Sequence, residues 1–223
     1  MSDFPFSAVG FDLDGTLLDT HRDLGAAVNF ALAEAGFDQV PVNSSKDLIG
    51  GGAKVMLTKA VEAQGSLPPE EFRPVYKTML SYYAENNAVH TAPYDGVAEV
   101  LDELDARGVT MAVITNKFEA FARKILTHLG LADRFVTIIG GDTMGKGRSK
   151  PEPYPILEAI TRCGGGRLAY VGDSSYDIRA ARAAAVPVVL AAYGYCDKPV
   201  EEMQADAAIY SPGELIAALE ALG

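Results

Sequence analysis

Short apolar segments alternate with longer segments of helical periodicity through most of this 223-residue chain. The apolar segments are rich in β-branched residues and are bounded by Gly, Asp or Asn, which is typical of buried strands. They are Ser7–Leu13, Val109–Thr115, Phe135–Gly141, Leu168–Gly172, Val186–Ala192 and Ala207–Tyr210. Because alternating strands and helices build βαβ units with right-handed crossovers, we expect an α/β fold with a doubly wound, mostly parallel sheet.

Residues 18–90 break this alternation, because their pattern indicates helices and no strand. Three apolar stripes have helical spacing: Leu24, Val28, Ala31, Leu32 and Ala35; Val55, Met56 and Ala60; and Phe72, Val75, Tyr76, Met79 and Tyr83. A helical block of about 70 residues greatly exceeds the 10–15 residues that normally join neighbouring strands. We therefore expect residues 1–17 and 91–223 to form the core domain and residues 18–90 an inserted α-helical cap domain. The alternative is that these helices are ordinary layers of a single domain.

The chain is acidic, with 19 Lys and Arg against 30 Asp and Glu and a formal net charge of −11. This balance argues against a nucleic-acid partner, since phosphate backbones are bound through basic surfaces. It allows a small phosphorylated ligand, for which a few local positive groups suffice. The longest apolar stretch, Ala183–Tyr193, contains Pro187 and falls far short of the ~18 residues that a spanning helix needs, so we expect no membrane partner.

Two sequence features bear on the cellular compartment. Cys163 and Cys196 lie far apart without a CxxC pattern, which favours reduced thiols over a disulfide framework or a zinc site. No Lys or Arg precedes Arg22, so no secretory signal is recognisable. We expect a cytoplasmic location, and no surface pattern indicates an oligomeric state.

Two carboxylates follow the first predicted strand, in the segment FDLDGTLLD at residues 11–19. Asp is disfavoured inside strands, and the spacing of two keeps the like charges of Asp12 and Asp14 close together. A divalent cation is the simplest compensation, because Mg²⁺ is commonly held by one or two carboxylates together with water and substrate phosphate. The alternative is a polar turn with both acids solvated.

Polar side chains also follow three later strands. Thr115 and Asn116 end the second strand, Asp173 and Asp177 follow a later one, and Lys150 lies in the loop after the third. Ligands of open α/β sheets bind outside the carboxyl ends of the strands. We expect the following residues to meet there: Asp12, Asp14, Thr115, Lys150 and Asp173. Together they offer the nucleophile, acid/base, metal site and cation that phosphoryl transfer needs.

The motifs DLDGTLLD, ITN, SKPEP and GDSSYD, in this order, resemble those of the haloacid dehalogenase-like hydrolase superfamily, whose core is a Rossmann-like sheet. The likeness extends over essentially the whole chain. Within the superfamily, the helical insert, its Gly50-Gly51-Gly52 turn, the Lys150-Pro151 element and Tyr193-Gly194-Tyr195 most resemble the phosphoglycolate phosphatases. The loop 142–149 departs from the family pattern because it is longer than usual.

The resemblance implies a role for each motif. Asp12 would be the nucleophile that forms an aspartyl-phosphate, and Asp14 would protonate the leaving alkoxide and then deprotonate the attacking water. Mg²⁺ would be held by the Asp12 carboxylate, the Asp14 backbone carbonyl and the Asp173 carboxylate, with Asp177 supporting the site.

The remaining motif residues would bind the substrate. The resemblance implies that Thr115 and the Asn116 backbone bind phosphate oxygens and that Lys150 neutralises charge on the nucleophile and the transferring group. The cap would close over the site and recognise the leaving group.

These roles predict a Mg²⁺-dependent phosphatase of a small phosphomonoester, with 2-phosphoglycolate as the expected substrate. Two alternatives stay open: a β-phosphoglucomutase-like sugar-phosphate isomerase and an inorganic pyrophosphatase of the same family. Haloacid dehalogenation is disfavoured, because dehalogenase relatives lack an acid at the position of Asp14.

Overall fold

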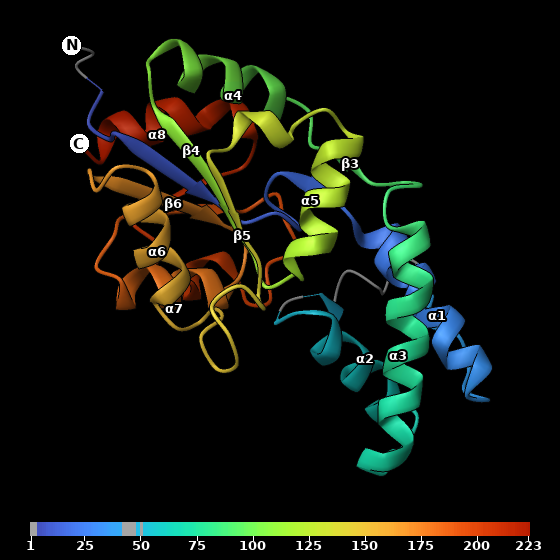
Figure 1. Cartoon of the computed structure of the whole chain (residues 1–223). Coiled ribbons are helices and arrows are strands. Elements are labelled where there is room, and N and C mark those ends of the chain that lie inside the picture. The colour runs from blue at the N-terminus through green and yellow to red at the C-terminus, as the bar shows by residue number, and fades with distance from the viewer. Residues whose placement is uncertain (1–3, 42–47, 50) are drawn as a thin grey trace. The chain divides into compact units, whose positions relative to one another are not determined.

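The computed structural model describes residues 4–41, 48–49 and 51–223. The chain separates into two compact units, one formed by Met1–Asp19 with Pro93–Gly223 and the other by Thr20–Ala92. The first unit contains the large sheet and the second contains helices α1, α2 and α3 (Figure 1).

The first unit is built on a six-stranded sheet of order β5-β4-β1-β6-β7-β8. Its strands are β1 (Ala8–Phe11), β4 (Thr110–Ile114), β5 (Thr137–Ile139), β6 (Leu168–Gly172), β7 (Val188–Ala191) and β8 (Ala207–Ile209). Every pair in the sheet is parallel. Each strand lies within a segment predicted from the sequence, and the predicted α/β fold class is confirmed. Strand β1 is central, and its Phe11 is in register with Val113 and Val171.

Helices cover both faces of this sheet. Helices α4 (Val97–Ala106) and α8 (Leu215–Ala221) lie on one face, and α6 (Tyr154–Arg162) and α7 (Ser175–Ala183) lie on the other (Figure 1). Helix α5 (Glu119–His128) contacts β5. The connections include three short 3₁₀ helices at Ala132–Arg134, Val200–Glu202 and Pro212–Glu214. This two-sided cover explains why the strands are continuous apolar runs rather than alternating ones.

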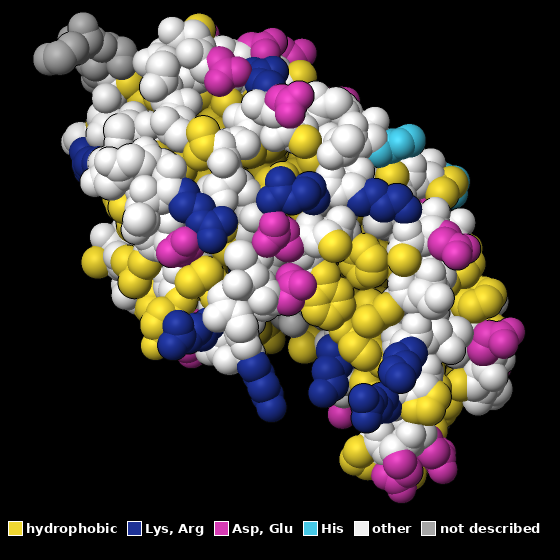
Figure 2. Space-filling view, viewed as in Figure 1, with side chains coloured by type: hydrophobic (Ala, Val, Ile, Leu, Met, Phe, Trp, Pro, Cys, Tyr) yellow, Lys and Arg dark blue, Asp and Glu magenta, His cyan; other side chains and the backbone are white. Residues whose placement is uncertain are grey.

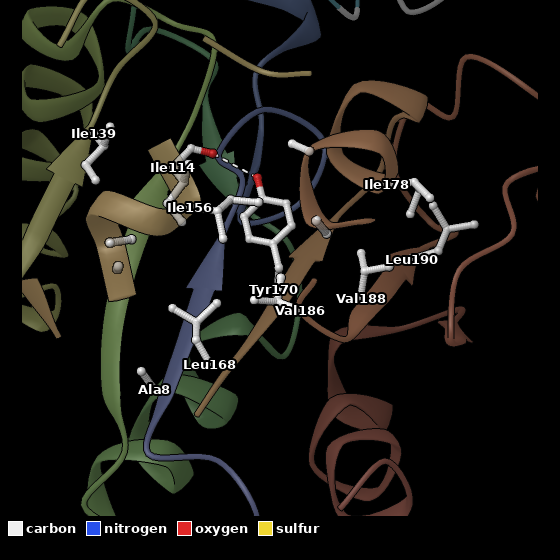
Figure 3. Packing of buried hydrophobic residues seen from close by; sticks show 14 of the residues in the cluster. Ala8, Ile114, Ile139, Ile156, Leu168, Tyr170, Ile178, Val186, Val188 and Leu190 are labelled. Carbon is white, nitrogen blue, oxygen red and sulfur yellow. Dashed lines mark hydrogen bonds between the residues drawn. The ribbon is translucent and has the colours of Figure 1, made fainter. Parts of the chain in front are cut away.

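The core beneath α6 and α7 is formed by residues from both layers. Ile114, Tyr170 and Val188 project from the strands and pack with Ile156 and Ile178 from the helices (Figure 3). Tyr170 is 0% exposed although it carries a hydroxyl group, which donates to the carbonyl of Ile114 at 2.9 Å. A buried hydroxyl needs such a partner, so this bond makes the tyrosine compatible with the core.

The second unit contains α1 (His21–Glu34), α2 (Ala53–Glu62) and α3 (Pro69–Asn86). Helices α1 and α3 pack together, and the rings of Phe30 and Tyr82 stack with 4.5 Å between centroids. The carboxylate of Asp23 accepts hydrogen bonds from the backbone N–H groups of Val89, His90 and Thr91. The start of α1 is therefore tied to the segment that follows α3.

Two sequence expectations concern the insert at residues 18–90. Strand β2 (Leu18–Asp19) pairs with β3 (Ala92–Pro93) in a separate two-stranded sheet. The prediction that residues 18–90 contain no strand is therefore wrong at Leu18–Asp19, because two residues are too few to produce a recognisable period. Of the glycine turn, Gly50 lies outside the described residues, whereas Gly51 and Gly52 adopt φ of 72° and 91° before α2.

The surface and the thiols add two observations. On the face shown in Figure 2, Lys and Arg side chains are interspersed with Asp and Glu side chains. Cys163 and Cys196 are both free thiols. Across the described ranges, every helix is too short or too polar to cross a membrane.

Candidate active site

Asp12 is the first residue after the central strand. Its N–H donates to the carbonyl of Val171 at 2.8 Å, so the pairing of β1 with β6 continues one residue past β1. The backbone therefore holds Asp12 rigidly at the carboxyl edge of the sheet, and the residue is only 7% exposed. Asp12 therefore follows a strand that has β4 on one side and β6 on the other.

A tight turn follows, and Gly15 has φ of 84° there. A Cβ atom at Gly15 would collide with the Asp173 carboxylate and the Tyr195 ring. A Cβ atom at Gly194, in the loop after β7, would also collide with the Asp173 side chain. Both glycines therefore let backbone lie directly against the Asp173 side chain, leaving no space for a β-carbon.

Lys150 lies between two of the predicted site carboxylates. Its Nζ is 2.9 Å from Asp12 Oδ1 and 2.5 Å from Asp177 Oδ1, and it donates to the Tyr170 hydroxyl at 2.9 Å. Burial lowers the pKa of Lys150, but Asp12 and Asp177 outweigh it and raise the pKa above the ordinary value. The long loop 142–149 therefore still brings a charged ammonium group to Asp12.

Asp177 is held by protein donors on both oxygens. Lys150 donates to Oδ1, and the Tyr170 hydroxyl lies 2.8 Å from the same oxygen. The N–H and hydroxyl of Ser174 donate to Oδ2. Ser174 and Asp177 also form the capping box that begins α7. An acid this fully hydrogen-bonded is suited to supporting a site from its edge.

Three carboxylates form a buried cluster. Asp12, Asp173 and Asp177 each offer an oxygen, and these oxygens lie within 4.8 Å of one another. Burial raises the pKa of Asp12 to about 6, despite Lys150, and raises the pKa of Asp173 well above its ordinary value, with Asp177 and Asp12 adding to the effect. The Lys150 ammonium group, 2.9 Å from Asp12 Oδ1, offsets part of the negative charge of the cluster.

This cluster fits a hard divalent cation. Closely spaced buried carboxylates repel one another, and an oxygen-seeking cation such as Mg²⁺ relieves that repulsion. Asp12 and Asp173 are the better candidates for direct ligands, because both oxygens of Asp177 accept hydrogen bonds from Lys150 or Ser174.

Thr115 and Asn116 follow β4 at the same edge of the sheet. The Thr115 N–H donates to Ile139 O at 2.9 Å, and its hydroxyl accepts from the Lys117 N–H at 3.2 Å. The Asn116 side chain donates to the backbone carbonyl of Lys150 at 3.0 Å. Asn116 therefore fixes the loop that carries Lys150, a contact that the sequence pattern did not indicate.

Two further residues of the site were missed from the sequence. Lys117 Nζ is 3.0 Å from Asp14 Oδ2, and the Lys117 side chain is only 4% exposed. Tyr170 contacts both Lys150 and Asp177 through its hydroxyl. Lys117 could have been predicted as a site residue, because it directly follows Asn116. Tyr170 could not, because it resembles any other apolar residue of a buried strand.

The chemical capacity of the site follows from these contacts. A buried carboxylate faces an ammonium group, a second carboxylate lies two residues away beside another ammonium group, and further acids can hold a cation. Such a set can attack an electrophilic phosphorus atom, stabilise its anionic oxygens and transfer a proton to a leaving oxygen.

Comparison with known proteins points to one family. The family model described as haloacid dehalogenase-like hydrolase matches residues 9–191. A phosphoglycolate phosphatase of Agrobacterium fabrum is 39% identical over 213 residues, which are 94% of this chain and 91% of that protein. An N-acetylmuramic acid 6-phosphate phosphatase of Pseudomonas aeruginosa is 36% identical over 218 residues, covering 96% and 94% of the two chains.

A solved structure agrees with these similarities. The crystal structure of "a predicted phosphoglycolate phosphatase" from Haemophilus somnus superposes with a TM-score of 0.86 at 32% identity. The superposition covers 95% of this chain and 97% of the other.

Proposed function

The chain belongs to the haloacid dehalogenase-like hydrolase family, and from that premise we propose that it hydrolyses 2-phosphoglycolate to glycolate and phosphate with Mg²⁺. The observation that carries the proposal is the buried Asp12 carboxylate, 2.9 Å from Lys150 at the end of the central strand. The names of the relatives support a phosphoric monoester hydrolase and favour this substrate.

The first chemical step uses Asp12. One carboxylate oxygen attacks phosphorus as the bond from phosphorus to the ester oxygen breaks, which gives an aspartyl-phosphate. Thr115 and the backbone N–H of Asn116 bind phosphate oxygens, and the ammonium group of Lys150 offsets negative charge on the transferring group. Lys150 is suited to this role because it is buried and already contacts the nucleophile.

Asp14 transfers the protons of both steps. It gives a proton to the departing glycolate oxygen, and it then takes a proton from the water that attacks the aspartyl-phosphate. That second attack releases phosphate and restores the Asp12 carboxylate. Support for this role comes from the position of Asp14 in the turn that follows Asp12, directly before Gly15.

The metal would be held by the carboxylates of Asp12 and Asp173 and by the backbone carbonyl of Asp14, with Asp177 supporting from the side. When bound, Mg²⁺ supplies charge neutralisation that lets a phosphate dianion approach a carboxylate. The fit rests on the buried cluster of three carboxylates, Asp12, Asp173 and Asp177, whose oxygens lie within 4.8 Å of one another.

The helical unit, Thr20–Ala92, is proposed to be the cap. Support comes from its place in the chain, inserted directly after the first strand and its turn. In this proposal the unit recognises the leaving group, as the resemblance implies.

The test is phosphate release from a substrate panel, measured with Mg²⁺ and with EDTA. The panel contains 2-phosphoglycolate, N-acetylmuramic acid 6-phosphate, glucose 1-phosphate and pyrophosphate; the second is included because of the relative with that name. We expect the highest kcat/KM for 2-phosphoglycolate and loss of activity in EDTA.

Other outcomes would overturn the proposal in distinct ways. Conversion of glucose 1-phosphate to another sugar phosphate without phosphate release would identify an isomerase. A preference for pyrophosphate would identify a pyrophosphatase. A preference for N-acetylmuramic acid 6-phosphate would keep the reaction and replace the substrate.

A further inference from the structure

Two lysines, rather than one, are buried among the acids of the site. Lys150 pairs with Asp12, and Lys117 pairs with Asp14 at 3.0 Å. The side chains of both lysines are at most 4% exposed. Removing an ammonium group from water is costly unless nearby negative charge compensates for it, so a second buried lysine requires a reason.

The two lysines lie on different sides of the proposed reaction. Lys150 accompanies the carboxylate that attacks phosphorus, whereas Lys117 accompanies the acid that protonates the leaving oxygen. Lys117 extends from the end of β4, directly after the residues proposed to bind phosphate, Thr115 and Asn116. In the proposed reaction Asp14 protonates the leaving oxygen, so the ammonium group beside Asp14 would face the alcohol half of the ester.

We propose that Lys117 binds an anionic group on the leaving alcohol and so selects phosphate esters that carry a carboxylate next to the ester oxygen. This inference rests on the proposed function and identifies the residue that determines which class of phosphate ester is preferred. In 2-phosphoglycolate a single methylene separates the ester oxygen from the carboxylate. A carboxylate that close to the ester oxygen falls beside the residue that protonates that oxygen, where Lys117 lies.

A lysine in this site can form ion pairs with two carboxylates at once. Lys150 already does so, because its Nζ contacts Asp12 at 2.9 Å and Asp177 at 2.5 Å. Lys117 would bridge Asp14 and the substrate carboxylate in the same way. The charge balance favours this arrangement, since an anionic leaving group next to Asp12, Asp14 and Asp173 needs a local cation.

The test compares three esters of equal chain length with leaving groups of different charge. They are 2-phosphoglycolate, which is anionic at that end, 2-hydroxyethyl phosphate, which is neutral, and 2-aminoethyl phosphate, which is cationic. Wild-type protein with Mg²⁺ is expected to prefer them in that order. In Lys117→Met, the ratio of kcat/KM for the anionic ester to that for the neutral ester should fall about 10- to 100-fold, as expected for a lost charge-assisted contact.

The cationic ester gives a second, independent readout. Its kcat/KM relative to the neutral ester should rise in Lys117→Met, because a repelling charge is gone. Loss of a purely structural contact would not produce this opposite change. Lys146→Met is the matched control, because Lys146 is an exposed residue of the same unit and its loss should leave both ratios at the wild-type values.

Four results would overturn the inference. An equal fall for all three esters in Lys117→Met would mean that Lys117 only orients Asp14. Unchanged kcat/KM values in Lys117→Met would show that Lys117 does not recognise the charge of the leaving group. A wild-type protein that does not discriminate among the esters would show the same. In both cases the assignment as a phosphatase would stand. Wild-type protein that releases phosphate from none of the esters would overturn the proposed function and this inference together.

A second variant covers the case in which Lys117→Met does not fold. Lys117→Gln keeps a hydrogen-bond donor but removes the charge, and it should shift both ratios in the same directions. Its folding is checked by far-UV circular dichroism before the kinetic comparison. Wild-type-like ratios in a folded Lys117→Gln protein would also contradict the inference.

Discussion

At the scale of single residues, Asp12 and Asp14 are two positions apart yet have different surroundings. Asp12 lies in the buried cluster with Asp173 and Asp177, where burial raises its pKa to about 6. Asp14 lies at the edge of that cluster and pairs with Lys117. The proposal gives these two carboxylates different roles, Asp12 as the nucleophile and Asp14 as the proton donor.

Replacing Asp14 by Asn tests that division. Turnover of 2-phosphoglycolate should slow by ~10²–10⁴, the usual effect of losing a general acid and base. Mg²⁺ binding, measured by calorimetry, should be largely retained, because only the backbone oxygen of Asp14 is proposed as a ligand. The control is Asp133→Asn, which makes the same change at an exposed site. Wild-type turnover at all pH values would remove Asp14 from its role.

Tyr170→Phe tests the support of Lys150. The variant deletes a buried hydroxyl that contacts Lys150, Asp177 and the carbonyl of Ile114. It should lower the free energy of unfolding by about 1–3 kcal/mol, because buried groups lose a partner, and it should slow turnover on the order of tenfold. Urea denaturation and steady-state kinetics measure the two effects.

The exposed Tyr154 provides the matched control for this change, since it is 42% exposed. Tyr154→Phe should leave both stability and rate near the wild-type values. If Tyr170→Phe behaved like this control, its hydroxyl would have no part in holding Lys150.

The residues that the sequence revealed and those it missed differ in one respect. Asp12, Asp173 and Lys150 were found because charged side chains at strand ends or in adjoining loops stand out from the apolar strands. Tyr170 was missed because its polar atom is a single hydroxyl on a buried, apolar strand. The partner of Lys117 could not be predicted, because an ion pair depends on side-chain placement between separate strands.

At the scale of elements, the parallel sheet explains why the site could be anticipated. Strands β1, β4 and β6 are adjacent and parallel, so the residues after them gather at one edge. The order of the strands in the sheet required the structure, and so did strand β2, which is only two residues long.

The turn after β1 gives a prediction at this scale. Gly15→Ala should abolish Mg²⁺ binding and activity, because the added methyl group would occupy the space of the Asp173 carboxylate. Gly145→Ala is the matched control: Gly145 has φ of 83°, and a Cβ there meets nothing within 4 Å. The control should show only the backbone strain, about 1–2 kcal/mol in urea denaturation. Equal losses of metal binding in the two variants would contradict the close packing proposed for Gly15.

At the scale of the whole molecule, the buried carboxylates couple folding to pH and to metal. Burial raises the folded-state pKa of Asp12 from 3.8 to about 6, so the folded protein retains a proton that the unfolded chain releases. The resulting stabilisation is fully present below about pH 4 and is lost as the pH rises through about 6. In EDTA, the contribution of Asp12 to the free energy of unfolding should therefore be smaller at neutral pH than near pH 5.

Mg²⁺ should restore stability at neutral pH, because it binds the folded carboxylate cluster and not the unfolded chain. At a concentration of ~100 times Kd the gain is about 2.7 kcal/mol. Asp173→Asn should lose most of this gain and should be more stable than wild type in EDTA, since one buried charge is removed. Thermal unfolding with and without Mg²⁺ measures both effects. A Mg²⁺ shift of wild-type size in Asp173→Asn would contradict the proposed metal site.

The most direct test of the account is to locate the phosphoryl group during turnover. Protein mixed with excess 2-phosphoglycolate and Mg²⁺ is quenched in acid within the first turnovers and digested, and its peptides are mapped by mass spectrometry. If Asp12 is the nucleophile, one acid-stable phosphoryl group will be found on the peptide that contains Asp12. It will be absent in Asp12→Asn, which should fold but not turn over. A phosphoryl group on another residue, or near-normal phosphate release by Asp12→Asn, would contradict the account.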